Sequence, residues 1–155
     1  MSIIFNKKTK IFYLEGKNVT YSFFVNNSGY LEHLYFGEKI DRDDIRYTAL
    51  EGRNSFEAMP HGKCFYNLKN PEISFFGVGD YKEPTVQVQN PEGDRISELL
   101  FEDYEILNEK PKIKGMPSMT GSQTLIVHLK DFVTDFAADL YYTDYGDADV
   151  IARRL

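Results

Sequence analysis

The sequence predicts an all-β fold, an antiparallel β-sandwich with few or no helices. Aromatic residues are frequent, with 11 Tyr and 12 Phe among 155 residues, and both types favour strands. Apolar and polar residues alternate with a period of two in several short stretches, as in half-buried strands. Because 42% of the residues are hydrophobic, residues 1–155 are predicted to form a single domain with its own core.

Three strands are predicted near the start of the chain, over residues 10–14, 18–25 and 30–36. The second alternates most clearly, with Thr20 and Ser22 on one face. Its other face carries Val19, Tyr21, Phe23 and Val25. The Asn26-Asn-Ser-Gly29 sequence that follows is typical of a hairpin turn, so neighbouring antiparallel strands are expected.

Residues 41–76 form an irregular region in which charges, glycines and prolines interrupt every apolar run. One short strand is predicted within it, near Cys64 to Leu68. Long irregular segments in compact domains are often functional or form interfaces. A mobile loop without such a role is the equally open alternative.

Regular alternation returns in the second half of the chain. The strands predicted there cover residues 85–89, 123–130, 136–142 and 150–154. The stretch 95–107 fits either a helix or a bent strand, and both readings stay open. An Asn90-Pro-Glu-Gly93 turn precedes it, and the Gly- and Pro-containing segment 111–121 follows as an extended connection.

Charge and composition exclude several classes of function. The net charge is −6 and no basic stripe is present, which argues against nucleic-acid binding. No run of about 18 apolar residues predicts a membrane span, and the first apolar run is too short for a signal peptide. The single cysteine, Cys64, fits a reducing compartment, so a cytoplasmic protein without metal or cofactor is expected.

Candidate catalytic groups are few. His61 and Cys64 could form a nucleophile pair, although no third, orienting residue is indicated. His33 and His128 fall inside predicted strands and are interpreted as structural. Scattered carboxylates are interpreted as a solvated acidic surface, namely Asp43, Asp44, Glu102, Asp103, Asp147 and Asp149. The Gly77–Pro84 segment lacks the Gly-Lys-Ser/Thr ending of a phosphate loop, and no catalytic residue is assigned.

Several segments, in the same order along the chain, resemble the N-terminal region of bacterial α-galactosidases of glycoside hydrolase family 36. Gly29-Tyr-Leu-Glu-His-Leu-Tyr-Phe-Gly37 is similar to the family's Gly-Tyr-Leu-x-His-x-Tyr-x-Gly strand, and Phe76–Pro84 to its Gly-x-x-Asp-Phe/Tyr-Arg-x-Pro segment. The other similar segments are Phe5–Leu14, Arg53–Phe56, Lys110–Pro117, Gln123–Asp131, Leu140–Thr143 and Asp149–Ile151. Each segment alone is weakly specific, but together they span nearly the whole chain.

The resemblance implies a β-sandwich that is part of a β-supersandwich, followed in the family by a TIM barrel with the catalytic aspartates. The chain is then an accessory N-terminal fragment of a homo-oligomeric enzyme that hydrolyses terminal α-galactosides of the melibiose and raffinose type. The chain alone is expected to be inactive. The alternatives are a stand-alone carbohydrate-binding or protein-interaction module and, less favoured, a free-standing enzyme that uses His61 or Cys64.

The resemblance also implies a substrate-contacting loop, at about Gly52 to Leu68 here. In tetrameric members this loop reaches the active site of a neighbouring subunit and contacts the sugar with an acidic and a basic residue. Gly52 replaces the family's aspartate, and Lys63 stands where the family has arginine. Arg53 and Lys63 are therefore the candidate substrate-binding residues, although lysine lacks the planar fork of arginine.

Overall fold

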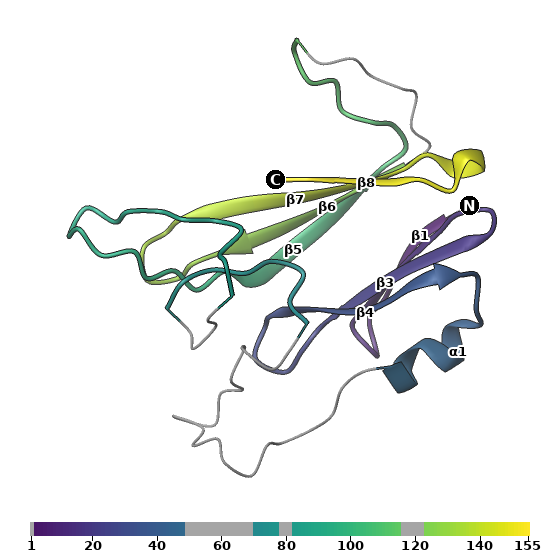
Figure 1. Cartoon of the computed structure of the whole chain (residues 1–155), viewed down its shortest axis with the longest axis horizontal. Coiled ribbons are helices and arrows are strands. Elements are labelled where there is room, and N and C mark those ends of the chain that lie inside the picture. Colours follow the sequence, from purple (N-terminus) through teal and green to yellow (C-terminus); the bar gives the residue numbers. More distant parts are fainter. Residues whose placement is uncertain (1, 49–69, 78–81, 116–122) are drawn as a thin grey trace.

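The computed structural model describes residues 2–48, 70–77, 82–115 and 123–155. It contains two four-stranded antiparallel sheets that pack face to face, with the β5–β8 sheet above the β1–β4 sheet in Figure 1. The predicted antiparallel β-sandwich is confirmed. Each sheet is a meander, since every strand pairs with its neighbour in the chain.

The first sheet consists of β1 (Ser2–Asn6), β2 (Ile11–Glu15), β3 (Val19–Val25) and β4 (Leu31–Glu38). The last three confirm the predictions over 10–14, 18–25 and 30–36. Strand β1 was not predicted, because its short apolar run shows no alternation, yet it pairs along its whole length with β2. The predicted turn between β3 and β4 is present, with Gly29 at φ +90° and its N–H donated to the Asn26 carbonyl at 3.0 Å.

The second sheet consists of β5 (Leu100–Leu107), β6 (Gln123–Lys130), β7 (Ala137–Asp144) and β8 (Ile151–Arg154). Strands β6, β7 and β8 confirm the predictions over 123–130, 136–142 and 150–154. The ambiguous stretch 95–107 ends in a strand, so its helical reading is wrong. Pairing with β6 decides the outcome, and a register shift between Phe101 and Asp103 gives this strand its irregularity.

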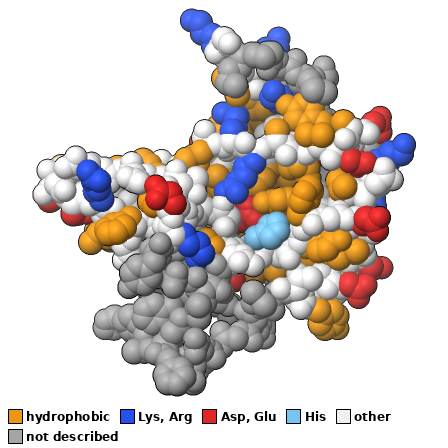
Figure 2. All heavy atoms as spheres, in the orientation of Figure 1, with side chains coloured by type: hydrophobic (Ala, Val, Ile, Leu, Met, Phe, Trp, Pro, Cys, Tyr) orange, Lys and Arg blue, Asp and Glu red, His pale blue; other side chains and the backbone are white. Residues whose placement is uncertain are grey.

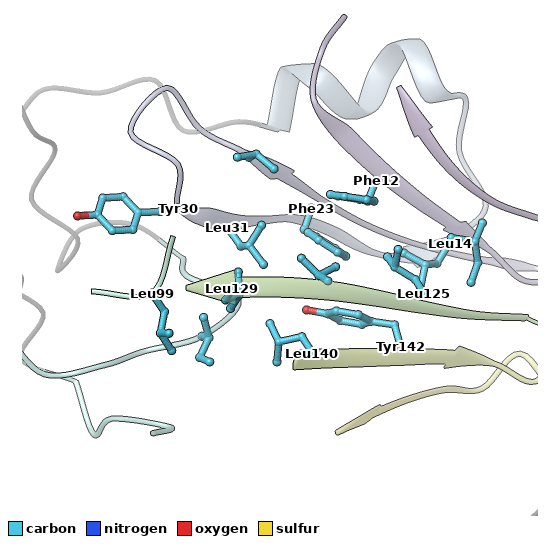
Figure 3. Close-up of a cluster of buried hydrophobic side chains, with 14 of the residues drawn as sticks. Phe12, Leu14, Phe23, Tyr30, Leu31, Leu99, Leu125, Leu129, Leu140 and Tyr142 are labelled. Atoms are coloured by element: carbon cyan, nitrogen blue, oxygen red, sulfur yellow. The ribbon is translucent and has the colours of Figure 1, made fainter. Parts of the chain in front are cut away.

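The main core lies between the two sheets and is aromatic on the β1–β4 side. The Phe12 and Phe23 rings stack at 4.8 Å, and the Phe23 ring stacks on Tyr142 of β7 at 4.9 Å. Figure 3 shows Leu125, Leu129 and Leu140 facing these rings from the second sheet. Phe23 and Val25, predicted to share one face of this strand, both belong to this core, and burial of its apolar surface is the main stabilising contribution.

The other face of the first sheet is also covered. Helix α1 (Arg42–Ile45) and the 3₁₀ turn η1 (Arg46–Thr48) lie at the start of the region predicted to be irregular. Ile45 is fully buried and packs in a second cluster with Ile11, Tyr13 and Leu34. This cover explains why Thr20 and Ser22, on the predicted polar face of β3, are both fully buried. The strand predicted near residues 64–68 lies outside the described residues.

The strand predicted over residues 85–89 is wrong. The N–H groups of Thr85 and Val86 both point to the Ser74 carbonyl, at 2.9 and 3.4 Å, and a single parallel bridge joins Phe75 to Val86. Val86 and Val88 are half-buried between exposed polar neighbours, so the alternation is real. Alternation alone makes no strand, because the neighbouring segment offers no continuous edge for pairing.

Candidate functional site

The residues predicted to bind substrate, Arg53 and Lys63, lie outside the described residues. The same holds for His61 and Cys64, the conceivable nucleophile pair. The roles given to these four side chains therefore stay predictions.

A buried polar cluster, which we call the Glu72 cluster, lies between the two sheets. It consists of Tyr21, His33, Glu72, Tyr142 and Arg153. The Glu72 side chain is 1% exposed, whereas the His33 and Arg153 side chains are 32% and 37% exposed. A buried carboxylate therefore lies beneath two half-exposed basic groups.

Each residue of the cluster comes from a different element. Tyr21 comes from β3 and His33 from β4, and both belong to the first sheet. Tyr142 and Arg153 come from β7 and β8 of the second sheet. Glu72 lies on an extended segment held against β4, because its N–H donates to the Leu31 carbonyl at 3.0 Å. The backbone of β4 also binds this segment two residues earlier, where the His33 N–H donates to the Asn70 carbonyl at 2.7 Å.

The carboxylate accepts hydrogen bonds from both sheets. The Tyr21 hydroxyl lies 2.9 and 2.7 Å from its two oxygens, and the Tyr142 hydroxyl lies 2.7 Å from Oε2. His33 Nδ1 lies 2.8 Å from Oε1, and because a carboxylate only accepts, this nitrogen is the donor. The guanidinium of Arg153 adds a longer ion pair, with Nη1 at 3.7 Å from Oε2.

Burial and the Glu72 charge keep both tyrosines protonated. Burial raises the pKa of Tyr21 far above its usual value, and the charge of Glu72 raises it further. Tyr142 is more deeply buried, and the same two causes raise its pKa well above the ordinary range, with the Arg153 charge opposing them. Both hydroxyls therefore stay hydrogen-bond donors at physiological pH.

This arrangement is suited to holding the sheets together and not to proton transfer. Two hydroxyls, an imidazole and a guanidinium surround the Glu72 carboxylate, so its oxygens have little capacity left for a substrate. In Figure 2 a histidine lies among hydrophobic side chains near the middle of the face, with basic side chains close to it. We interpret the cluster as a structural link between the two sheets, with two half-exposed basic side chains, His33 and Arg153.

Sequence reasoning missed Glu72, although it placed Tyr21, His33 and Tyr142 in strands. The only local signal is that this acidic residue precedes Ile73-Ser-Phe75, a short alternating run whose apolar members are each 1% exposed. The four partners of Glu72 are far from it in the sequence. His33 is 39 positions away, Tyr21 is 51, Tyr142 is 70 and Arg153 is 81. No spacing rule connects positions so far apart.

The other carboxylates singled out in the sequence do not form a catalytic pair in the described part of the chain. Asp43, Asp44, Glu102, Asp103 and Asp147 are all exposed. Asp149 instead links the two sheets at one end, because it accepts hydrogen bonds from the Asn18 N–H and side chain at 2.8 and 2.7 Å. His128, in β6, forms a hydrogen bond with Asp139 on the outer face of the second sheet, with 2.8 Å between Nδ1 and Oδ1.

Metal-ligand clusters and membrane-spanning helices are both absent from the described ranges. Across residues 2–48, 70–77, 82–115 and 123–155, no group of three or more His, Cys, Asp or Glu side chains could hold a metal ion. Over the same ranges, no helix has the length and apolar character needed to cross a membrane.

The sequence profile of the Glycosyl hydrolase family 36 N-terminal domain matches residues 29–155. The chain therefore belongs to this family.

The relatives are α-galactosidases several times longer than this chain. The chain is 35% identical over 161 residues to alpha-galactosidase Mel36A of Lactobacillus acidophilus. This alignment covers 97% of the chain and 22% of that relative. It is 33% identical to the bifunctional alpha-galactosidase/sucrose kinase AgaSK of Mediterraneibacter gnavus, over 99% of the chain and 17% of that relative. The chain thus spans about a fifth of the length of these curated relatives.

Solved structures agree with this assignment. The galactosidase domain of AgaSK superimposes with a TM-score of 0.89 at 32% identity, over 98% of this chain and 22% of that chain. A variant of the family 36 α-galactosidase AgaA from Geobacillus stearothermophilus, solved in complex with raffinose, gives a TM-score of 0.82 at 26% identity. That match covers 93% of this chain and 21% of the AgaA chain.

Proposed function

We propose that this chain is the accessory N-terminal domain of an α-galactosidase and acts together with a catalytic barrel on the same polypeptide. The observation that carries the proposal is the match of the family 36 N-terminal domain to residues 29–155. The relatives named alpha-galactosidase align with this chain over only 22% or less of their length, which leaves ample room for a catalytic domain elsewhere. The domain itself supplies no catalytic residue under this proposal.

The proposed substrates are terminal α-galactosides of the melibiose and raffinose type. The support comes from AgaA, which was solved with raffinose and, in another variant, with stachyose. Both are α-galactoside oligosaccharides. A cytoplasmic location is part of the proposal, in keeping with the low cysteine content of the sequence, a single Cys64.

The test is to express the polypeptide encoded by the whole reading frame and to assay it. We expect hydrolysis of p-nitrophenyl α-D-galactopyranoside and release of galactose from raffinose. The matched β-galactoside should remain intact. A well-folded polypeptide that cleaves neither α-galactoside would overturn the proposal.

Within such an enzyme, the domain is proposed to support oligomer assembly and to shape the entrance to the active site. The support is the family membership of the chain over residues 29–155. The described residues on either side of 49–69 pack on the sandwich, Ile45 in the second cluster and Glu72 in the Glu72 cluster.

Arg53 and Lys63 are proposed to contact the sugar bound in a neighbouring subunit. The support is the resemblance of their segment to the family's substrate-contacting loop. In the longer enzyme, Lys63→Ala should raise KM for raffinose about tenfold, because one hydrogen bond from a charged group to the sugar is lost. The KM for p-nitrophenyl α-D-galactopyranoside should change little. Equal kinetics of variant and parent on raffinose would remove Lys63 from the proposal. The control is Lys112→Ala, at an exposed position of the described chain.

A further inference from the structure

Strand β7 ends in a carboxyl group that faces the core. Leu140 and Tyr142 belong to the main core, and Asp144 follows them on the same face of the strand, where it is 1% exposed. Its Oδ1 accepts the Gly146 N–H at 2.8 Å, whereas its Oδ2 is buried and has no hydrogen-bond partner among the described residues. A buried carboxylate oxygen without a donor makes the ionised form unfavourable.

The surroundings of Asp144 do not compensate a negative charge. Asp144 forms no ion pair with the Lys, Arg or His side chains that the structure describes. Its register partners on the neighbouring strands are neutral, namely Gln123 on β6 and Ile151 on β8. Toward the first sheet, Gln123 Oε1 accepts the Ile3 N–H at 3.0 Å, so this side is neutral too.

Burial is the largest influence on the ionisation of Asp144 and raises its pKa above the ordinary value of 3.8. The Gly146 N–H and the charge of the amino terminus oppose burial, whereas the charge of Asp149 acts in the same direction as burial. The neutral carboxylic acid is thus favoured by both the geometry and the electrostatics of the site.

The turn that Asp144 supports links the two sheets at one end. It contains the 3₁₀ turn η4 (Gly146–Ala148), the yellow coil on the right of Figure 1. Asp149 follows in the left-handed region, at φ +51°, and donates its N–H to the Gly146 carbonyl at 3.0 Å. Its carboxylate binds Asn18, in the turn between β2 and β3. A Cβ added at Gly16 would lie 2.8 Å from Asp149 Oδ1, so the two turns are in close contact.

We propose that Asp144 is a proton-dependent latch, in which release of the Asp144 proton loosens the β7–β8 turn from the first sheet. Ionisation places charge on an oxygen that has no donor, and water can reach this oxygen only if the turn opens. Opening breaks the hydrogen bond from Gly146 and, with it, the support of the Asp149–Asn18 contact. Such a latch belongs to the domain itself and does not depend on the proposed function.

The direction of the pH effect follows from the closed and open states of the turn. Below pH 3.8 both states hold the Asp144 proton, so pH does not act through this group. Above it the open state releases the proton first, and opening gains about tenfold per pH unit until the closed state also ionises. Asp149 acts in the opposite direction, because the Asn18 N–H lowers its pKa and its contact is lost as the pH falls.

Carbon-13 NMR of the labelled 155-residue chain tests the protonation of Asp144, because side-chain carboxyl shifts report ionisation. Through-bond assignment of the parent chain makes this measurement independent of any variant. We expect the Asp144 carboxyl to titrate at a higher pH than the Asp149 carboxyl of the same turn. Titration of Asp144 at the same pH as Asp149, or at a lower pH, would overturn the proposal.

Amide hydrogen exchange at Asn18 and Gly146 measures the opening of the turn. Asp144→Asn keeps an oxygen acceptor for the Gly146 N–H but has no proton to release, so parent and variant are compared at each pH. The protection of both amides in the parent, relative to the variant, should fall about tenfold per pH unit within the window above 3.8.

The Val127 amide, in the middle of β6, is the control and should keep the same protection ratio at every pH. An equal fall at Val127 would show that the whole sandwich loosens and would overturn a latch at this end. Parallel exchange of parent and variant at Asn18 and Gly146 would overturn it as well, even if Asp144 titrates at the higher pH.

Discussion

Two carboxylates, Glu72 and Glu15, occupy opposite faces of the first sheet and serve different purposes. Glu72 is 1% exposed and binds residues of both sheets. Glu15 is 11% exposed and binds Arg42 of the short helix, with Nε and Nη2 at 2.6 and 2.7 Å. Arg42 remains 45% exposed. Glu72 thus joins the two sheets from a desolvated position shared by several partners, whereas Glu15 fixes one local element, the short helix, through a partly exposed arginine.

The largest expected effect is the loss of the buried carboxylate. Glu72→Ala leaves two buried hydroxyls and a guanidinium without their acceptor, so we expect the free energy of unfolding to fall by about 4 kcal/mol. Urea unfolding followed by tyrosine fluorescence measures this loss. The control is Glu15→Ala, and equal losses for the two variants would contradict the distinction between them.

Alkaline pH should sharpen the same comparison. Burial and the Glu72 charge raise the pKa values of Tyr21 and Tyr142 above the ordinary value of 10.0. The unfolded chain therefore releases these protons first, so stability is intact below pH 10 and falls as the pH rises above it. Each tyrosine contributes a slope of about 1.4 kcal/mol per pH unit.

The measurement is the unfolding free energy between pH 9 and 11. A double variant with Tyr21→Phe and Tyr142→Phe should flatten the curve. Tyr13, on the outer face, has a pKa that burial raises but Arg42 lowers, so it should contribute less. A curve whose slope is unchanged by the double variant would show that these two tyrosines are not the source.

Removal of the Tyr142 hydroxyl alone should have a smaller effect on stability. Tyr142→Phe keeps the ring in the core but removes a hydrogen bond to a carboxylate, which should lower stability by about 2 kcal/mol. Tyr141→Phe is the matched control, because its ring lies on the other face of β7 beneath Arg154 at 3.5 Å. That change should stay within about 0.5 kcal/mol. Thermal unfolding of both variants decides, and a larger loss for Tyr141→Phe would contradict the assignment.

The smallest effect is expected at the rim. Arg42→Gln should lower stability by at most about 1 kcal/mol, because the Arg42 side chain is 45% exposed and its ion pair with Glu15 is screened by solvent. The Arg42 hydrogen bond lowers the pKa of Glu15 from 4.5, so this contribution is present above that pH and is lost as the pH falls. Unfolding at low and high salt checks it: salt should diminish the difference at Arg42 and leave that at Glu72 nearly unchanged.

The two sites also differ in how far the sequence predicts them. Strand positions were predictable wherever alternation coincided with an available partner edge, as in β3, β6 and β7. Residues 85–89 alternate equally well, but only one bridge, between Val86 and Phe75, is present there in the described part of the chain. The alternation in this stretch therefore reflects which side chains are buried, and it does not indicate pairing with another strand. Strand β1 has no alternation and was missed, because its place is fixed by β2.

Local sequence patterns do not predict the short helix or the polar contacts between the sheets. Helix α1 has four residues, too few to give a helical period, although its cap residue Asp41 and the acidic first turn are ordinary start signals. The Glu72 cluster depends on five positions that meet only after both sheets have formed. The family resemblance of the sequence, by contrast, depends on the order of segments and was confirmed by the match over residues 29–155.

The central proposal is that this domain belongs to an α-galactosidase and does not itself catalyse hydrolysis. The most direct test is to incubate the purified 155-residue chain with p-nitrophenyl α-D-galactopyranoside and to measure nitrophenol release. We predict no release above the rate in buffer, with the chain shown to be folded by its cooperative unfolding. Release that disappears on substitution of His61→Ala or Cys64→Ser would contradict the claim and establish a catalytic site within the chain.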